Sequence, residues 1–246
     1  MALTYTVVSI GTLSRNRFWG ESEPRRVAHA TTTLIRDGDT TILVDPGLPG
    51  ELLAQRLDER TGLKPEQIDL VFLTNFRPVH RRALGLFAGA GWLMHGPEIE
   101  AVRGHLENLS ASLSFDPEAV DARHADQSHP AAEHAASEQR DLEALVRQER
   151  GLLDRIKSAD DRLSRRVHLF PSVGATPGSA ALLLTDTART VLVAGDAVVS
   201  RDYFEVGRVF EQVYDLQAAQ AALQDVMEVA DVIVPGHDNL FMVAGW

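Results

Sequence analysis

The chain has 246 residues, of which 44% are hydrophobic, and this length and composition predict one globular domain with a sizeable core. Its 35 acidic residues outnumber 24 basic ones, and the formal charge of -11 argues against a nucleic-acid partner, because phosphate groups would be repelled. The chain has no cysteine, which excludes disulfides, iron–sulfur clusters and thiolate nucleophiles, so any metal ion must be bound by imidazole and carboxylate groups.

The first residues, MALTYTVVSIGTLSR, alternate between apolar and polar types as a strand does. They contain neither a basic leader nor a long apolar segment. We therefore expect this segment to be part of the mature fold, with a cytoplasmic location and no membrane partner.

Four later segments share one layout, in which a β-branched apolar run ends in a polar group. Such runs are typical of buried strands. A strand followed at once by polar residues or by Pro and Gly must end in a turn, and these turns are candidate functional loops. The segments are Thr40–Gly47 (TTILVDPG), Ile68–Asn75 (IDLVFLTN), Thr190–Asp196 (TVLVAGD) and Asp231–His237 (DVIVPGH).

Hairpin turns and helices lie between these strands. The turns RDGDT at Arg36–Thr40 and TDTART at Thr185–Thr190 separate pairs of apolar runs, which predicts antiparallel hairpins. Helical spacing occupies Glu51–Arg60 and Leu216–Val229. The apolar faces of these helices are Leu52, Leu53 and Leu57 in the first, and Leu216, Ala219, Leu223 and Met227 in the second. Strands with interspersed helices predict an α/β or α+β fold.

The segment from about Glu98 to Arg166 is rich in Ala, Glu and Arg and predicts a helical insertion. A stripe of apolar residues at helical spacing runs along it, which could cover the core, form a lid over a cleft or pair with a second copy in a homodimer. A histidine-rich stretch inside the insertion is interrupted by Pro130, which favours a solvated loop over a metal cluster. The stripe is Leu142, Leu145, Leu152, Ile156 and Leu163, and the histidines are His124, His129 and His134.

The polar residues that follow the predicted strands form one candidate site. Three of them, Asn75, Arg77 and His80, come from one loop, and Asp196 and His237 come from two others. A lone histidine or aspartate at a strand end is more often structural, so the prediction depends on their combination.

This combination resembles the metallo-β-lactamase superfamily. Five segments are similar to that family's landmarks in the right order: TILVDPG, KPEQIDLVFLT, GATPGSAALLL, VLVAGDAV and VIVPGHD. The resemblance implies a four-layer αββα sandwich over residues 1–246, in which residues 98–166 form the helical insertion. It also implies that Asp45, at the end of TILVD, is a structural aspartate.

The resemblance implies that half of the family's metal centre is missing. The family's metal loop is THxHxDH, whereas this chain has TNFRPVH, and Ala175 replaces the histidine of the GHTPGS turn. Amide, guanidinium and methyl groups do not replace imidazole as zinc ligands, so the first metal site should not form. Arg77 would instead pair with Asp196 as a permanent cation. His80, Asp196 and His237 remain for one divalent ion, with zinc first and iron or manganese as alternatives.

Two hypotheses for function follow. In the first, the protein is a pseudoenzyme, a non-catalytic or strongly altered member that binds an anionic ligand or a partner through Asn75 and Arg77. In the second, it is a metal-dependent hydrolase of an ester, thioester, lactone or amide, with one ion at His80, Asp196 and His237. The joint change of several metal positions in a readable scaffold favours the first. Asp238 is a further candidate, as an acceptor that orients the imidazole of His237.

Overall fold

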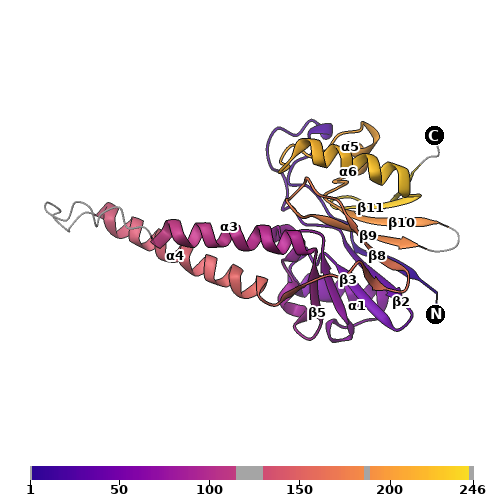
Figure 1. Cartoon of the computed structure of the whole chain (residues 1–246), viewed down its shortest axis with the longest axis horizontal. Coiled ribbons are helices and arrows are strands. Elements are labelled where there is room, and N and C mark those ends of the chain that lie inside the picture. Colours follow the sequence, from indigo (N-terminus) through magenta and orange to yellow (C-terminus); the bar gives the residue numbers. More distant parts are fainter. Residues whose placement is uncertain (1, 115–129, 186–188, 244–246) are drawn as a thin grey trace. The chain divides into compact units, whose positions relative to one another are not determined.

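The structure is a computed structural model that describes residues 2–114, 130–185 and 189–243. It contains two compact units, which are described separately: Met1–Ile99 together with Lys157–Trp246, and Glu100–Ile156. Figure 1 shows the chain with many of its helices and strands labelled. Within the described residues, no helix combines the length and the apolar character needed to cross a membrane.

The first of two six-stranded sheets follows the chain order from β1 to β6. Its strands are β1 (Thr4–Ser9), β2 (Thr32–Asp37), β3 (Thr40–Val44), β4 (Leu70–Leu73), β5 (Gly91–Met94) and β6 (Ile156–Ser158). The pairs β1–β2 and β2–β3 are antiparallel, which confirms the predicted hairpin at Arg36–Thr40. The pairs β3–β4 and β4–β5 are parallel, so these three strands end at the same edge of the sheet.

The second sheet has the order β12-β11-β10-β9-β8-β7. Its strands are β7 (Arg162–Ser164), β8 (Val167–Pro171), β9 (Ala180–Thr185), β10 (Thr190–Gly195), β11 (Val232–Pro235) and β12 (Phe241–Met242). The pair β9–β10 is antiparallel, as the sequence predicts. The pair β10–β11 is parallel, so these two strands also end side by side.

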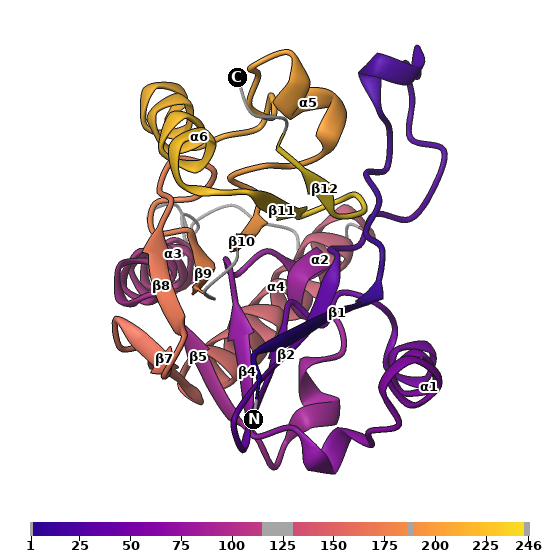
Figure 2. The same ribbon diagram turned by 90° about the vertical axis from the view of Figure 1, so that its right-hand side faces the viewer.

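The two sheets enclose the main core, and helices cover their outer faces. The core includes Ile35, Ile42 and Phe72 from the first sheet and Leu182 and Val193 from the second. Helix α1 (Gly50–Thr61) packs against the first sheet, and α6 (Leu216–Val229) covers the second beside α5 (Arg201–Glu205) (Figures 1 and 2). These layers are the predicted αββα sandwich. Shorter helical turns are η1 (Arg17–Trp19), η2 (Pro65–Gln67), α2 (Pro78–Arg81) and η3 (Leu84–Phe87).

The predicted apolar faces of α1 and α6 are correct except at their first turns. Leu53, Leu57, Ala219 and Leu223 are buried. Leu52 is 40% exposed and Leu216 is 56% exposed. Both leucines stand close to the start of their helices, where the chain enters from the surface.

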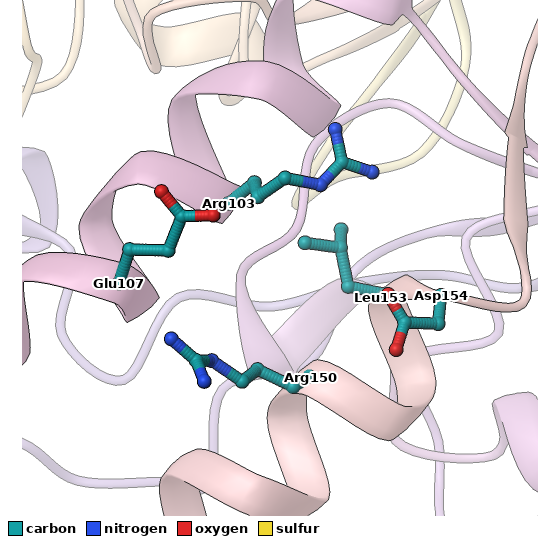
Figure 3. A pocket seen from close by; sticks show the side chains of 5 residues that line it. All are labelled: Arg103, Glu107, Arg150, Leu153 and Asp154. Carbon is teal, nitrogen blue, oxygen red and sulfur yellow. The ribbon is translucent and has the colours of Figure 1, made fainter. Parts of the chain in front are cut away.

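The second unit consists mainly of two helices, α3 (Gly96–Ser114) and α4 (Pro130–Leu153). Leu106, Val146 and Leu153 are buried in it, and Gln139 Nε2 donates to the carbonyl of Leu113 at 2.9 Å. A cavity of about 250 Å³ in this unit has a mostly charged lining (Figure 3). The lining residues are Arg103, Glu107, Arg150, Leu153 and Asp154.

The predicted helical insertion needs two corrections. Ile156 lies in β6 and Leu163 in β7, so the helical stripe ends before them. Strands of three residues are too short to show an alternating pattern. His134 lies on α4 rather than in a loop, because Pro130 begins that helix at the position where proline is tolerated. His124 and His129 lie outside the described residues.

Candidate metal centre

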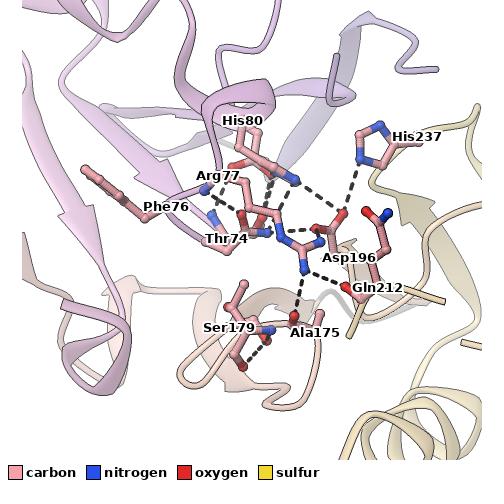
Figure 4. Close-up of polar contacts among 12 residues, drawn as sticks. Thr74, Phe76, Arg77, His80, Ala175, Ser179, Asp196, Gln212 and His237 are labelled. Carbon is pink, nitrogen blue, oxygen red and sulfur yellow. Dashed lines mark hydrogen bonds and ion pairs between the residues drawn. The ribbon is translucent and has the colours of Figure 1, made fainter. Parts of the chain in front are cut away.

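The site lies where parallel strands of both sheets end. Asp45 follows β3 and Thr74 follows the neighbouring β4, while Asp196 follows β10 and His237 comes two residues after β11. Gly195 lets the two sheets meet here, because a Cβ atom on it would lie 2.5 Å from Thr74 Oγ1. All five predicted site residues are brought together, and Figure 4 labels four of them, Arg77, His80, Asp196 and His237.

The imidazole of His80 is held between two carboxylates. His80 lies on the short helix α2 and is fully buried. Its Nδ1 is 2.9 Å from Asp45 Oδ2, and its Nε2 is 3.3 Å from Asp196 Oδ1. Asp45 has a positive φ of 50° and is fixed by the amide and hydroxyl of Thr74, at 2.9 and 2.7 Å. Asp45 thereby keeps a proton on Nδ1 and directs Nε2 toward Asp196.

The imidazole of His237 is oriented by backbone carbonyls. Its Nδ1 is 3.0 Å from the carbonyl oxygen of His29 and 3.3 Å from that of Thr12. Because a carbonyl only accepts hydrogen bonds, Nδ1 carries the proton. The other ring nitrogen, Nε2, then faces Asp196 Oδ1 at 3.2 Å.

The prediction that Asp238 orients His237 is wrong. Its Oδ2 accepts from the amide of Arg201 at 3.1 Å, and its Oδ1 accepts from the amide of Asn239 at 2.7 Å. Consecutive side chains at a strand end point in different directions, so this carboxylate faces the start of α5 instead of the imidazole.

The two carboxylate oxygens of Asp196 have different surroundings. Oδ2 accepts from Arg77 Nη1 at 2.8 Å and from Asn75 Nδ2 at 3.2 Å. Oδ1 is buried and has no hydrogen bond of normal geometry, although the Nε2 atoms of His80 and His237 lie 3.3 and 3.2 Å away. One oxygen is therefore satisfied by the protein, and the other faces two imidazole nitrogens.

In the metal-free chain, the contacts among His80, Asp45, Asp196 and His237 shift the pKa values of His80 and Asp196. Burial opposes a charge on His80, yet the carboxylates of Asp196 and Asp45 raise its pKa to about 10. Burial also opposes the charge of Asp196, yet the charge of His80 and the adjacent imidazole of His237 hold the pKa of Asp196 well below its ordinary value. The cluster therefore favours a positive charge beside Oδ1.

A divalent metal ion fits the same position. His80, Asp196 and His237 each offer one ligand atom, and these three atoms lie within 4.8 Å of one another. Two ligand atoms bound to tetrahedral zinc at about 2.1 Å lie roughly 3.4 Å apart, close to the two oxygen–nitrogen separations given above. Two imidazoles and one carboxylate are also a common set of ligands for zinc and iron. A bound divalent ion would replace the proton of His80 Nε2 as the positive charge beside the buried Oδ1.

Arg77 pairs with Asp196, as the sequence predicts, and its guanidinium is further held by carbonyls. Nη2 donates to the carbonyl oxygens of Ala175 and Gln212, both at 2.8 Å. Asn75 Oδ1 accepts from the amide of Arg77 at 3.0 Å, which fixes the loop between them. Asn75 and Arg77, predicted to bind an external ligand, both donate to Asp196.

Sequence reasoning missed several supporting groups. Glu98 accepts from the amides of Phe76 and Gly178 and from the hydroxyl of Thr176. In the sequence it marks only a helix start after Pro97, and no spacing connects it to the site. The carbonyls that hold Arg77 and His237 carry no side-chain signal at all.

Comparisons with known proteins agree with the fold. A family model described as the metallo-beta-lactamase superfamily matches residues 25–237. No curated sequence is significantly similar to the chain. Solved structures match at low sequence identity, which supports the fold and not the activity.

Three of the matching structures are those of the proteins AidC, AiiA and AbOPH. AidC, a dizinc quorum-quenching lactonase in complex with a product, is 15% identical with a TM-score of 0.61, over 87% of this chain and 74% of its own. A variant of AiiA from B. thuringiensis, with N-decanoyl-L-homoserine at its active site, is 16% identical with a TM-score of 0.60, over 96% and 92%. AbOPH, a hydrolase in the beta lactamase superfamily, is 17% identical with a TM-score of 0.57, over 96% and 84%.

Proposed function

The chain belongs to the metallo-β-lactamase superfamily, and we propose that it binds one divalent metal ion through His80, Asp196 and His237 and hydrolyses an ester, thioester, lactone or amide. Zinc is the first choice of ion, with iron or manganese as alternatives. The observation that carries the proposal is Asp196 Oδ1, a buried acceptor without a hydrogen bond that faces two imidazole nitrogens. Three protein ligands leave a position open for a substrate.

The protein itself fills the position beside the other carboxylate oxygen. Arg77 and Asn75 occupy Asp196 Oδ2 with a guanidinium and an amide, so this side needs no second ion. A second metal ion on the Oδ2 side would be repelled by the permanent positive charge of Arg77. We therefore propose a stoichiometry of one.

The roles of the residues follow from this geometry. When bound, a divalent ion supplies a Lewis acid that polarises the carbonyl group of a substrate. The guanidinium of Arg77, 31% exposed, adds positive potential where negative charge develops on the carbonyl oxygen. Val79 stands where the family has an aspartate and offers no proton acceptor, so turnover should be slow.

The burial of the cluster favours a second candidate, a non-catalytic member. The side chains of His80, Asp196 and His237 are only 0%, 3% and 5% exposed, and a substrate needs access to the ion. In this candidate the site has a structural or ligand-binding role. Arg77 is a weaker anchor for an anion than the sequence suggests, because both terminal nitrogens already donate to protein acceptors.

Metal content tests the proposal directly. The full chain, purified without chelator, should contain about one equivalent of a divalent metal, and the double variant His80→Ala/His237→Ala should contain none. His105→Ala, which removes an exposed histidine of α3, is the matched control and should keep the parent's content. A parent without metal, even after incubation with zinc, iron and manganese, would overturn the metal site.

Activity separates the two candidates. The metal-loaded parent is assayed on a panel of esters, thioesters, lactones and amides, with Asp196→Asn as the inactive reference. Hydrolysis that is lost in Asp196→Asn supports the enzyme. Stoichiometric metal without hydrolysis of any panel member supports the non-catalytic candidate.

The missing half of the site can also be restored. The triple variant Asn75→His, Arg77→His and Ala175→His returns three imidazoles to the positions where the family pattern has them. Its metal content should rise from about one to about two equivalents. Content that stays at one would show that the absence of these side chains is not what prevents a second ion from binding.

A further inference from the structure

Glu98 is a buried carboxylate at the junction of β5 and α3, and it is 2% exposed. Its Oε1 accepts from the amide of Phe76 at 3.1 Å. Its Oε2 accepts from the hydroxyl of Thr176 at 2.8 Å and from the amide of Gly178 at 2.9 Å. One carboxylate therefore connects the loop after β4 with the turn between β8 and β9.

These two segments provide the immediate surroundings of Arg77. Phe76 stands between Asn75 and Arg77, the two residues that donate to Asp196 Oδ2. Thr176 directly follows Ala175, whose carbonyl accepts from Arg77 Nη2. A shift of either segment would change how the guanidinium meets Asp196.

The connection is tight. A Cβ atom on Gly178 would lie 2.0 Å from the backbone nitrogen of Glu98, so only glycine allows this approach. The carbonyl of Gly178 is also 2.9 Å from His95 Nδ1, which holds the same turn from a second side. The turn cannot move away from α3 without breaking several contacts at once.

The partners of Glu98 are all neutral. Among the described residues, its three hydrogen bonds come from two backbone amides and one hydroxyl, and no ion pair involves it. Burying a carboxylate without a cation is costly, even where donors satisfy it. A neutral side chain could fill this space, so the carboxylate with its three donors indicates a role beyond packing.

We propose that Glu98 is a positioning residue for the metal centre: it fixes Asn75 and Arg77 against Asp196 Oδ2 and thereby keeps Oδ1 directed at His80 and His237. The inference rests on the proposed function, because it assigns Glu98 a role in the geometry of that metal site. Glu98 touches none of the three proposed ligands, so its effect must pass through Arg77 and Asn75.

The test uses Glu98→Gln in the full chain with Co²⁺ as the probe metal. All three partners are donors, so the amide group of glutamine must face at least one of them and lose that bond. We expect Co²⁺ affinity about 10- to 100-fold weaker than in the parent, and a changed visible spectrum of the bound Co²⁺. Glu100→Gln, on the same helix but with a side chain 73% exposed, is the control and should match the parent.

A second variant and a second readout keep the test decisive. If Glu98→Gln does not fold, Thr176→Val removes one donor of the carboxylate and should weaken Co²⁺ binding in the same direction. Independently of metal, the destabilisation caused by Arg77→Met should be smaller in the Glu98→Gln background, because the guanidinium is then less well placed against Asp196.

The outcomes separate the inference from the proposed function. A parent that does not bind Co²⁺ overturns the proposed metal site, and the Arg77→Met comparison then decides the role of Glu98 alone. A folded Glu98→Gln variant with the parent's Co²⁺ affinity, spectrum and Arg77→Met penalty would overturn the inference.

Discussion

Removing the guanidinium of Arg77 should destabilise the metal-free protein well beyond the effect of a surface arginine. Arg77→Met keeps most of the stem but loses the ion pair with Asp196 and two hydrogen bonds to carbonyls. Breaking a fully buried pair costs about 3–5 kcal/mol. Arg77 is 31% exposed and Asp196 keeps the charge of His80 nearby, so solvent and this second cation reduce the penalty. We expect a loss of about 2–3 kcal/mol in the free energy of unfolding.

Urea unfolding after chelator treatment measures this loss. The matched control is Arg56→Met, which removes an ion pair to Glu59 at 3.0 Å between side chains that are 47% and 45% exposed. Such a surface pair contributes only about 0.3–0.5 kcal/mol. In a chain of this size, each kcal/mol lowers the melting temperature by about 2–4 °C, so Arg77→Met should melt roughly 4–12 °C below the parent.

A double-mutant cycle identifies the partner that matters. Asp196→Asn is combined with Arg77→Met in the metal-free state, and the two effects should be strongly non-additive because the charges face each other at 2.8 Å. Equal penalties for Arg77→Met and Arg56→Met, or additive effects in the cycle, would refute the reasoning. Arg77 would then be held in place without stabilising Asp196.

Two further predictions concern other carboxylates. Asp45→Asn should weaken zinc binding about 10- to 100-fold in a chelator competition, because a neutral amide no longer orients and polarises His80 through Nδ1; unchanged affinity would contradict this. Burial opposes the charge of Asp37, but hydrogen bonds from Ser164 and Arg166 and the Arg166 charge lower its pKa. A depressed pKa stabilises the fold above the unfolded value of about 3.9, and this stability is lost as pH falls through the folded value. The stability gap between the parent and Asp37→Asn, from urea unfolding at a series of pH values, should therefore be full at pH 7 and shrink below about pH 4, whereas a constant gap would count against it.

The fold could be predicted because its signals are local. The β-branched apolar composition of the runs TTILV and TVLVAG predicts buried strands. The glycine and aspartates at Arg36–Thr40 predict a hairpin turn. The short strands β6 and β7 were mispredicted as helix. Each has three residues, and an alternating pattern cannot be recognised in so few. Exposure at the starts of α1 and α6 depends on where the chain enters each helix, which the spacing of leucines does not encode.

The site was predictable to the extent that side chains define it. His80, Asp196 and His237 follow strands whose ends must meet, so their association could be inferred before any geometry was available. The backbone carbonyls that accept hydrogen bonds from Arg77 and His237 could not be inferred, because every residue has the same carbonyl group. Glu98 was missed for a related reason, since its three donors are scattered over residues 76 to 178 and two of them are backbone amides.

The two carboxylate oxygens of Asp196 differ in the positive groups that face them. A buried carboxylate must be neutralised wherever it faces the interior. On the Oδ2 side, Arg77 supplies a permanent charge that is bonded to the chain and cannot dissociate. On the Oδ1 side no ion pair with an arginine or lysine is found among the described residues, and this oxygen faces the Nε2 atoms of His80 and His237, which can bind a proton or a metal ion. The proposed single ion at Oδ1 is therefore consistent with the charges that the protein itself provides, because the Oδ2 face already has the cation of Arg77.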